Sequence, residues 1–206
     1  MDSGNIGFVL LCAAFVFVMT PGLAMFYGGL VRKKNVVNTM MTSIFIIGIG
    51  IVMWVLFGYS LSFAPSGNAF IGDFRWLGLE GVSLTEGYTD DASIPNMVFS
   101  AFQMMFAVIT PALITGAVAG RMKFKSIFVF TIFWSLIVYY PLAHMVWGQG
   151  GLLGADGIGA LDFAGGDVVH ISSGVSALVL CILLGKRHDY EHSIYRIHNI
   201  PTVVLG

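Results

Sequence analysis

Five runs of apolar residues, each close to or above the length needed to cross a lipid bilayer, dominate this chain of 206 residues. A transmembrane helix needs about 20 consecutive, mostly apolar residues. The runs cover residues 5–31, 36–63, 95–119, 126–147 and 167–185, and a further apolar stretch begins at about residues 199–206. The sequence therefore predicts an all-α integral membrane protein, a helical bundle with five transmembrane helices.

Composition agrees with this class. Hydrophobic residues make up 57% of the chain and charged residues 10%, against roughly 25% charged residues in soluble domains. The mean hydropathy is +0.86. A net charge of −1 opposes nucleic-acid binding, which requires a basic surface. Cys12 and Cys181 lie inside apolar runs, so we expect neither a disulfide framework nor a cysteine metal site.

Basic residues indicate the orientation of the chain in the membrane. Nine of the ten fall in three alternate connections between the apolar runs: Arg32, Lys33, Lys34, Arg121, Lys123, Lys125, Lys186, Arg187 and Arg196. Alternate connections lie on one side of a membrane, and the positive-inside rule predicts that this side is cytoplasmic. We therefore expect the N-terminus outside, and we interpret the first run as a retained span and not a signal peptide.

Glycine is dense, with 26 residues in the chain. Gly48 and Gly50 lie in the second run, and Gly116 and Gly120 lie in or next to the third. Small residues let transmembrane helices approach closely, where dispersion and weak hydrogen bonds hold them together. The sequence predicts tight helix packing at these positions.

The segment DFAGGDVVHISSG, from Asp162 to Gly174, places a carboxylate and an imidazole at the start of the fifth run. Ionisable residues at membrane depth generally mark functional pathways. For Asp162, two roles stay open: capping the exposed N–H groups of a helix start, which is the commoner role of such a residue, and contact with a solute. For His170, we favour a neutral ring that relays a proton or binds a small solute over a satisfied core group.

Aromatic residues near the ends of the third and fourth runs also have two interpretations. Trp147 follows His144 by three residues, which places both on one helix face. The Trp147 indole either attracts a cation or anchors the helix at the headgroup level, where His144 would be interfacial too. Phe102 and Phe106 are four residues apart, and with Gln103 they either line a pore or pack against a neighbouring helix.

At this point a family resemblance emerges. The segment DFAGGDVVHISSGVSALVLCILLGKR resembles the signature of the ammonium transporter family (Amt/Mep/Rh), in particular its prokaryotic Amt type. The segments TPGLAMFYGGLVRKKNVVN, AFQMMFAVITPALITGAVAGRMKF, PLAHMVWGQGGLL and HNIPTVVLG resemble further family segments in the expected order. The resemblance covers essentially the whole chain, and a colinear match of this length is more specific than any single motif.

The resemblance implies roles for five residues. Trp147 and Phe106 match aromatic residues of the family's outer cation-recruitment site, and Phe106 also matches one of its two gate phenylalanines. Asp162 matches an aspartate near that site that acts through electrostatics and backbone support, and His170 matches the first of twin pore histidines. Gln103, one turn from Phe106, is expected in the same vestibule. The implied mechanism is ammonium selection, deprotonation, and passage of ammonia along a hydrophobic pore with proton relay by the histidines.

The resemblance also implies an eleven-helix fold of two inverted five-helix repeats plus one helix, with the pore between the repeats. Residues 1–206 correspond to the first repeat and the start of a sixth span. We expect the second half, with the second histidine, the second gate phenylalanine and an outer-site serine, to come from elsewhere, because one half has no closed pore. A homotrimer in the cell membrane and a PII-type regulatory protein at the cytoplasmic face are further implied.

We expect a transport protein and not an enzyme, and two rival functions stay open. The first is an ammonium sensor on the same fold, which signals to a cytoplasmic partner through the basic stretch 186–198. The second is a membrane redox protein with His144 and His170 as haem ligands. A zinc hydrolase is disfavoured because the sequence has no HExxH motif. With the transporter favoured, we expect no cofactor and no metal.

Overall fold

The computed structural model describes residues 1–65, 68–155, 157–187, 190 and 196–206. Within these ranges the chain is helical, with no β-strand. Five helical segments are long and apolar enough to cross a membrane: Ser3–Leu30, Lys33–Phe63, Asn96–Val118, Phe124–Trp147 and Gly166–Leu184. Each begins and ends within one helical turn of its predicted range. The prediction of an all-α membrane bundle with five spans is therefore confirmed.

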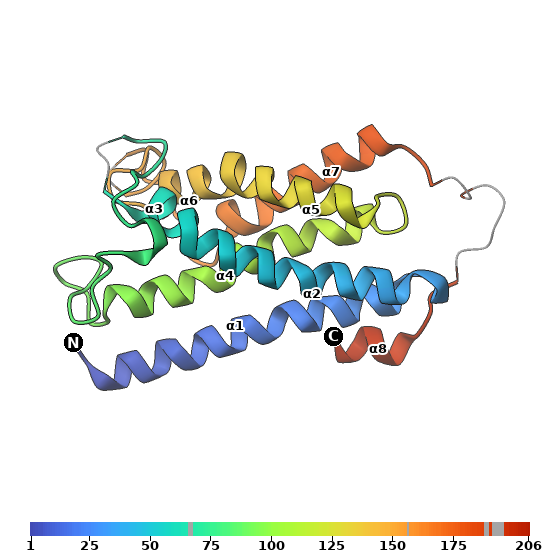
Figure 1. Ribbon diagram of the computed structural model, residues 1–206, viewed down its shortest axis with the longest axis horizontal. Helices are drawn as coiled ribbons and strands as arrows, with labels where there is room; N and C mark the ends of the chain where they lie inside the picture. Colours follow the sequence, from blue (N-terminus) through green and yellow to red (C-terminus); the bar gives the residue numbers. More distant parts are fainter. Residues whose placement is uncertain (66–67, 156, 188–189, 191–195) are drawn as a thin grey trace.

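The spans lie along the long axis of the molecule, and each runs in the opposite direction to the one before it (Figure 1). The first is α1 (Ser3–Leu30), and the second consists of the short 3₁₀ turn η1 (Lys33–Asn35), α2 (Val36–Met53), η2 (Trp54–Gly58) and α3 (Tyr59–Phe63). The third is α4 (Asn96–Val118). The fourth consists of α5 (Phe124–Trp134), η4 (Ser135–Tyr139) and α6 (Tyr140–Trp147), and the fifth of η5 (Gly166–Ile171) and α7 (Ser172–Leu184).

Three spans contain a feature that the apolar pattern does not predict. The segments η2, η4 and η5 are π-helical turns, in which the backbone bonds skip one residue more than in an α-helix. In η5, for example, the His170 N–H donates to the Gly165 carbonyl at 3.0 Å. Apolar content alone cannot distinguish such a turn from an α-helix, because in both the backbone N–H and C=O groups form hydrogen bonds within the segment.

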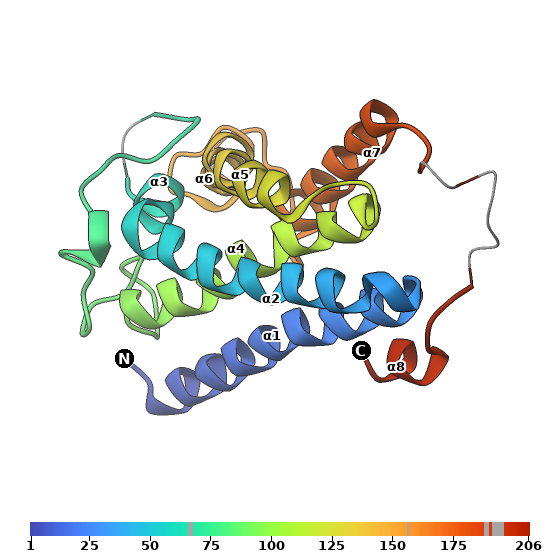
Figure 2. The same cartoon turned by 45° about the vertical axis from the view of Figure 1, so that its right-hand side comes forward.

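The central helix of the bundle is α4, which packs against α1, α2 and α7 (Figures 1 and 2). Polar side chains join the helices where they meet. Trp54 Nε1 donates to Ser100 Oγ at 3.3 Å, and Trp134 Nε1 donates to Ser176 Oγ at 2.8 Å. Tyr27 donates its hydroxyl proton to the Leu113 carbonyl at 2.8 Å, which ties α1 to α4.

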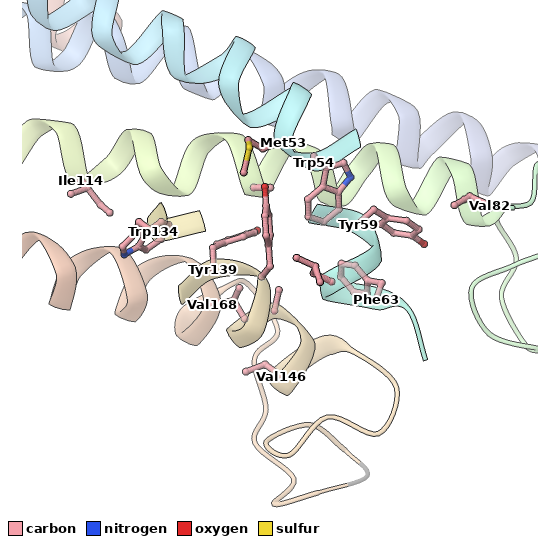
Figure 3. Packing of buried hydrophobic residues seen from close by; sticks show 14 residues of the cluster. Met53, Trp54, Tyr59, Phe63, Val82, Ile114, Trp134, Tyr139, Val146 and Val168 are labelled. Carbon is pink, nitrogen blue, oxygen red and sulfur yellow. The ribbon is translucent and has the colours of Figure 1, made fainter. Parts of the chain in front are cut away.

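A cluster of buried aromatic rings forms where η2, α3, η4 and α6 meet. Figure 3 shows Trp54, Tyr59 and Phe63 on one side of this cluster and Trp134 and Tyr139 on the other. Tyr140 joins the two sides, with ring centroids 6.1 Å from Trp54 and 5.9 Å from Tyr139. Tilted and edge-to-face ring pairs at such distances add stability beyond the area that they bury.

The connections of the bundle separate by charge, as predicted. The N-terminus, the segment 64–95 between α3 and α4, and the segment 148–165 between α6 and η5 lie at one end of the bundle (Figure 1). The connections after α1, α4 and α7, which carry nine of the ten basic residues, lie at the other end. That this second end is cytoplasmic stays a prediction.

Beyond α7, the short helix α8 (Ile200–Leu205) lies at the predicted start of a sixth span and packs against α1. Its cap, Asn199, accepts a hydrogen bond from the Thr202 N–H at 3.0 Å, and the N–H groups of His198 and Asn199 donate to the Gly29 carbonyl. Gly29 allows this approach, because a Cβ there would lie 2.5 Å from a methyl carbon of Val203.

The expectation of close packing at glycines is correct for two positions and wrong for one. A Cβ on Gly50 would lie 3.1 Å from Val108 Cα, and a Cβ on Gly116 would lie 2.4 Å from the Tyr27 ring. A Cβ on Gly48 would meet no atom within 4 Å, since this glycine faces away from α4. Gly120 lies past the end of α4 and adopts a positive φ of 72°, which favours glycine in a turn.

Gly50 and Gly48 provide a matched test of this packing. We expect Gly50→Ala to destabilise the fold by about 1–3 kcal/mol, because the added methyl group forces α2 away from α4. Gly48→Ala should leave stability unchanged or raise it by up to about 1 kcal/mol, because alanine favours a helix over glycine. Thermal unfolding in detergent measures both, and equal melting temperatures for the two variants would contradict the close contact at Gly50.

Candidate functional site

A cavity of about 620 Å³ opens at the end of the bundle that contains the N-terminus. Its floor and sides come from α4 and from Trp147, the last residue of α6, and its outer wall comes from the segments 64–95 and 148–165. The lining residues are Tyr88, Thr89, Ala92, Ile94, Phe99, Phe102, Gln103, Phe106, Trp147, Phe163, Ala164 and Gly165. The cavity is thus mostly apolar and aromatic, as binding sites for small solutes usually are.

Three aromatic rings meet around this cavity. Phe102 and Phe106 lie one turn apart on α4, and their rings pack edge to face with centroids 5.1 Å apart. The Phe106 ring in turn packs edge to face against the Trp147 indole at 6.5 Å. Aromatic faces carry partial negative charge, so a cation in the cavity is attracted to them.

Gln103 adds a polar group to the same wall. Its Oε1 atom is buried and has no hydrogen-bond partner in the described part of the chain. A buried amide oxygen without a partner loses its hydration and gains nothing in return, so such atoms call for an explanation. The atom is closed off from the cavity in this arrangement, so a solute reaches it only if the Gln103 side chain turns.

Trp147 is fixed by the turn that follows it. Its Nε1 donates to the backbone carbonyl of Asp162 at 3.3 Å. The chain then folds back over the end of α6, where the N–H groups of Leu153 and Gly154 donate to the Met145 carbonyl at 2.8 and 2.9 Å. Gly151 makes this return possible, since a Cβ there would lie 2.3 Å from the His144 carbonyl oxygen.

Asp162 caps the fifth span. Its Oδ1 accepts from the Gly166 N–H at 2.6 Å, and its Oδ2 accepts from the N–H groups of Asp167 and Val168 at 3.0 Å each. These bonds occupy the carboxylate, which does not line the cavity. The geometry is that of the capping role, and Asp162 contributes to the cavity wall through the backbone that it holds, residues 163–165.

His170 lies on the exposed side of η5, outside the cavity lining. Neighbouring Val168 and Val169 are buried, whereas Ile171 and several apolar residues of α7 are as exposed as His170. The ring has no hydrogen-bond partner within the described ranges. The structure therefore brings together Trp147, Phe106 and Gln103, and places Asp162 behind their wall and His170 on a separate surface.

His144 is fully buried, which corrects the alternative of an interfacial residue. The reason is that its two ring nitrogens contact the carbonyl oxygens of Ser62 and Asn68, at 3.1 and 2.8 Å, so the ring ties the end of α6 to the segment after α3. Because both nitrogens are occupied, neither is available to ligate a haem iron. This geometry opposes the interpretation of His144 and His170 as axial ligands.

The sequence interpretation missed the outer wall, above all Tyr88. This residue lies in a polar connection whose pattern gives no sign of a contact with α4 or with the turn after α6. Its ring stacks on Phe99, with centroids 4.8 Å apart and an interplanar angle of 7°. Burial raises the pKa of the Tyr88 hydroxyl to about 12, so this hydroxyl group keeps its proton well above neutral pH.

Comparison with known proteins agrees with these features. Residues 7–206 match the sequence model of the Ammonium Transporter Family. The chain belongs to this family. An ammonium transporter of Bacillus subtilis (strain 168) is 52% identical over 206 residues, which cover all of this chain and 49% of that protein. Membership of the family accounts for the multi-pass, all-α architecture.

Solved structures of family members have the same fold. The crystal structure of Candida albicans Mep2 matches with a TM-score of 0.86 and 32% identity, over 100% of this chain and 45% of that one. A structure described as a sensor Amt protein matches with a TM-score of 0.82 and 27% identity, over 98% of this chain and 50% of that one. The chain thus spans about half the length of the family members that it matches.

The cap at Asp162 can be tested against its neighbour Asp167. Both Asp162→Asn and Asp167→Asn remove one negative charge beside the same helix start. Only Asp162→Asn also replaces a carboxylate oxygen that accepts backbone N–H bonds with an amide nitrogen, which cannot accept them. We expect Asp162→Asn to cost about 1–3 kcal/mol of unfolding free energy. Asp167→Asn should cost a few tenths, by loss of the helix-dipole interaction.

Thermal unfolding in detergent, with hydrogen exchange of residues 163–171 as the local probe, measures both variants. If the two variants lose equal stability and exchange at equal rates, the helix dipole and not the cap stabilises this helix start.

Proposed function

We propose that the protein that carries this sequence transports ammonium across the cell membrane, and that the cavity beside Trp147 is where the cation enters. The observation that carries the proposal is the group of Phe102, Phe106 and Trp147 around a mostly apolar cavity that Gln103 also lines. Membership of the ammonium transporter family supports the choice of substrate.

Aromatic faces attract any desolvated cation, by about 0.5–2 kcal/mol each. Ammonium and potassium are therefore both attracted to the three rings. The two ions differ in that ammonium carries a proton that it can release, whereas potassium does not. Selection between them in this proposal depends on the loss of that proton and not on pore diameter.

The next step is loss of the proton near Phe106. An unsupported cation is costly to move through hydrocarbon, whereas neutral ammonia crosses at little cost and leaves potassium behind. In this proposal the Phe106 ring closes the floor of the cavity to hydrated ions. His170, one turn into the fifth span, takes part in carrying the proton onward. Asp162 holds the start of that span and adds negative potential near the site.

The proposed pore needs a second surface opposite η5 and α7. This face exposes His170 together with Ile171, Val175 and Leu178, an arrangement that suits contact with further protein. We propose that the other half of an eleven-helix fold covers it. Further parts of the proposal are a homotrimer, an external N-terminus, and a PII-type protein that binds the basic end of the bundle.

Transport can be tested by currents of the complete protein in proteoliposomes on a solid-supported membrane. We expect ammonium jumps, but not potassium jumps, to give a current. Phe106→Leu should raise the half-saturating ammonium concentration about 3- to 30-fold, which corresponds to the loss of one cation–π contact. Phe128→Leu is the matched control, because Phe128 lies on the exposed side of α5, away from the cavity.

The role of His170 has its own test in the same assay. His170→Ala should abolish the ammonium current or let potassium carry current, because the proton is no longer relayed. His198→Ala, an exposed histidine at the other end of the bundle, should behave as the parent. A His170→Ala variant with the parent's current and selectivity would contradict proton relay through this residue.

An ammonium sensor is the second candidate, favoured by the similarity to the sensor Amt protein over 98% of the chain. A sensor would use the same cavity to bind ammonium but pass the signal to a cytoplasmic partner. Ammonium binding to the parent is measured by quenching of tryptophan fluorescence. If the correctly folded parent binds ammonium and yet carries no current, sensing becomes the proposed function in place of transport.

A further inference from the structure

The outer wall of the cavity is held by a contact between two connections that are far apart in sequence. Gln149 lies two residues after Trp147, and Tyr88 lies in the segment between α3 and α4. The Gln149 backbone N–H donates to the Tyr88 hydroxyl oxygen at 3.1 Å. The Gln149 side-chain Nε2 donates to the Tyr88 backbone carbonyl at 3.0 Å. Gln149 thus bonds to both the side chain and the backbone of Tyr88.

Tyr88 is itself fixed to the helices. Its ring stacks on Phe99 at 4.8 Å and meets the edge of Phe63 at 5.5 Å. Phe99 lies one turn before Phe102 and Gln103 on α4 and lines the same cavity. Tyr88 therefore connects α4 to the turn after α6, and it lines the cavity together with residues of α4 and Trp147.

The backbone between Trp147 and Gln149 has little freedom to absorb a shift. The single residue between them is Gly148, whose N–H donates to the His144 carbonyl at 2.9 Å. A Cβ on Gly148 would lie 2.7 Å from His144 Nδ1 and 3.0 Å from the Ser62 carbonyl oxygen. The positions of Gln149 and of the Trp147 backbone are therefore coupled, because His144 and Ser62 crowd the glycine between them.

We infer that Tyr88 and Gln149, the Tyr88–Gln149 clamp, are positioning residues that fix the Trp147 indole and the outer wall, and so set the distance between a bound cation and the aromatic rings. The inference rests on the proposed function of the cavity as an ammonium site. Cation–π attraction depends on distance, so a wall that yields weakens ammonium binding and reduces the preference for ammonium over larger cations such as methylammonium.

Two variants remove the two bonds of the clamp separately. Tyr88→Phe keeps the stacking on Phe99 but deprives the Gln149 N–H of its acceptor, and Gln149→Ala keeps that bond but removes the one from Nε2. Tyr190→Phe is the matched control, because it removes the same hydroxyl group from an exposed tyrosine that does not line the cavity. All are made in the complete protein.

Currents evoked by ammonium and by methylammonium give the functional result. For each clamp variant, we expect the half-saturating ammonium concentration to rise about 2- to 5-fold, as for loss of one partly exposed hydrogen bond. The maximal current should stay that of the parent, and the ratio of methylammonium to ammonium current should rise. A purely structural role would instead lower the amount of folded protein, and with it the maximal current, at unchanged half-saturation.

Hydrogen exchange of the peptide that contains Gln149 gives a result independent of transport, and we expect it to quicken in Tyr88→Phe and not in Tyr190→Phe. The clamp is overturned if the parent transports ammonium while both variants keep its half-saturation and its methylammonium ratio. It is also overturned if exchange at Gln149 does not change. A folded parent without any ammonium current is a different result, visible before any variant is made, and it overturns the proposed function together with the clamp.

Discussion

A bilayer provides no water for polar groups, so polar side chains in the spans bond either to carbonyl groups of their own helix, as Thr110 does, or to partners on neighbouring helices. The bundle meets this constraint with a few specific bonds: Trp54 to Ser100, Trp134 to Ser176, and Tyr27 to the Leu113 carbonyl. Two of the three bonds end on α4, which for this reason can have only one rotation relative to α1 and α2. The direction in which Phe102, Gln103 and Phe106 point from α4 follows from that rotation.

The same constraint explains why the end of the bundle, and not its middle, contains the cavity. Within the spans, side chains and close-packed glycines such as Gly50 fill the space between helices. At the end, the connections 64–95 and 148–165 are wet on their outer side and can leave backbone groups to solvent. On their inner side, Tyr88 and Phe163 line the cavity together with the rings of α4 and Trp147, so the proposed cation site places π faces next to the solvent.

The five spans and their ends could be predicted from the sequence because the bilayer imposes a length and a composition on each one. For Asp162 the sequence leaves two roles open, and the bonds of its carboxylate to three N–H groups are those of the capping role. The contact between Tyr88 and Gln149 could not be predicted, because it joins polar connections 61 residues apart and no periodicity relates them. The burial of His144 was missed for a similar reason, since its partners are backbone carbonyls, which carry no sequence signature.

The π-helical turns change the direction in which the following side chains of a span face. One residue more in a turn advances the following residues by about 100° around the helix axis. In the fourth span, η4 therefore turns the residues of α6 by about 100° from the directions that an unbroken α-helix would give them. Trp134 of α5 is buried against α7, while Trp147 of α6 reaches the cavity. Without the extra residue in η4, another side of α6 would face the cavity in place of Trp147.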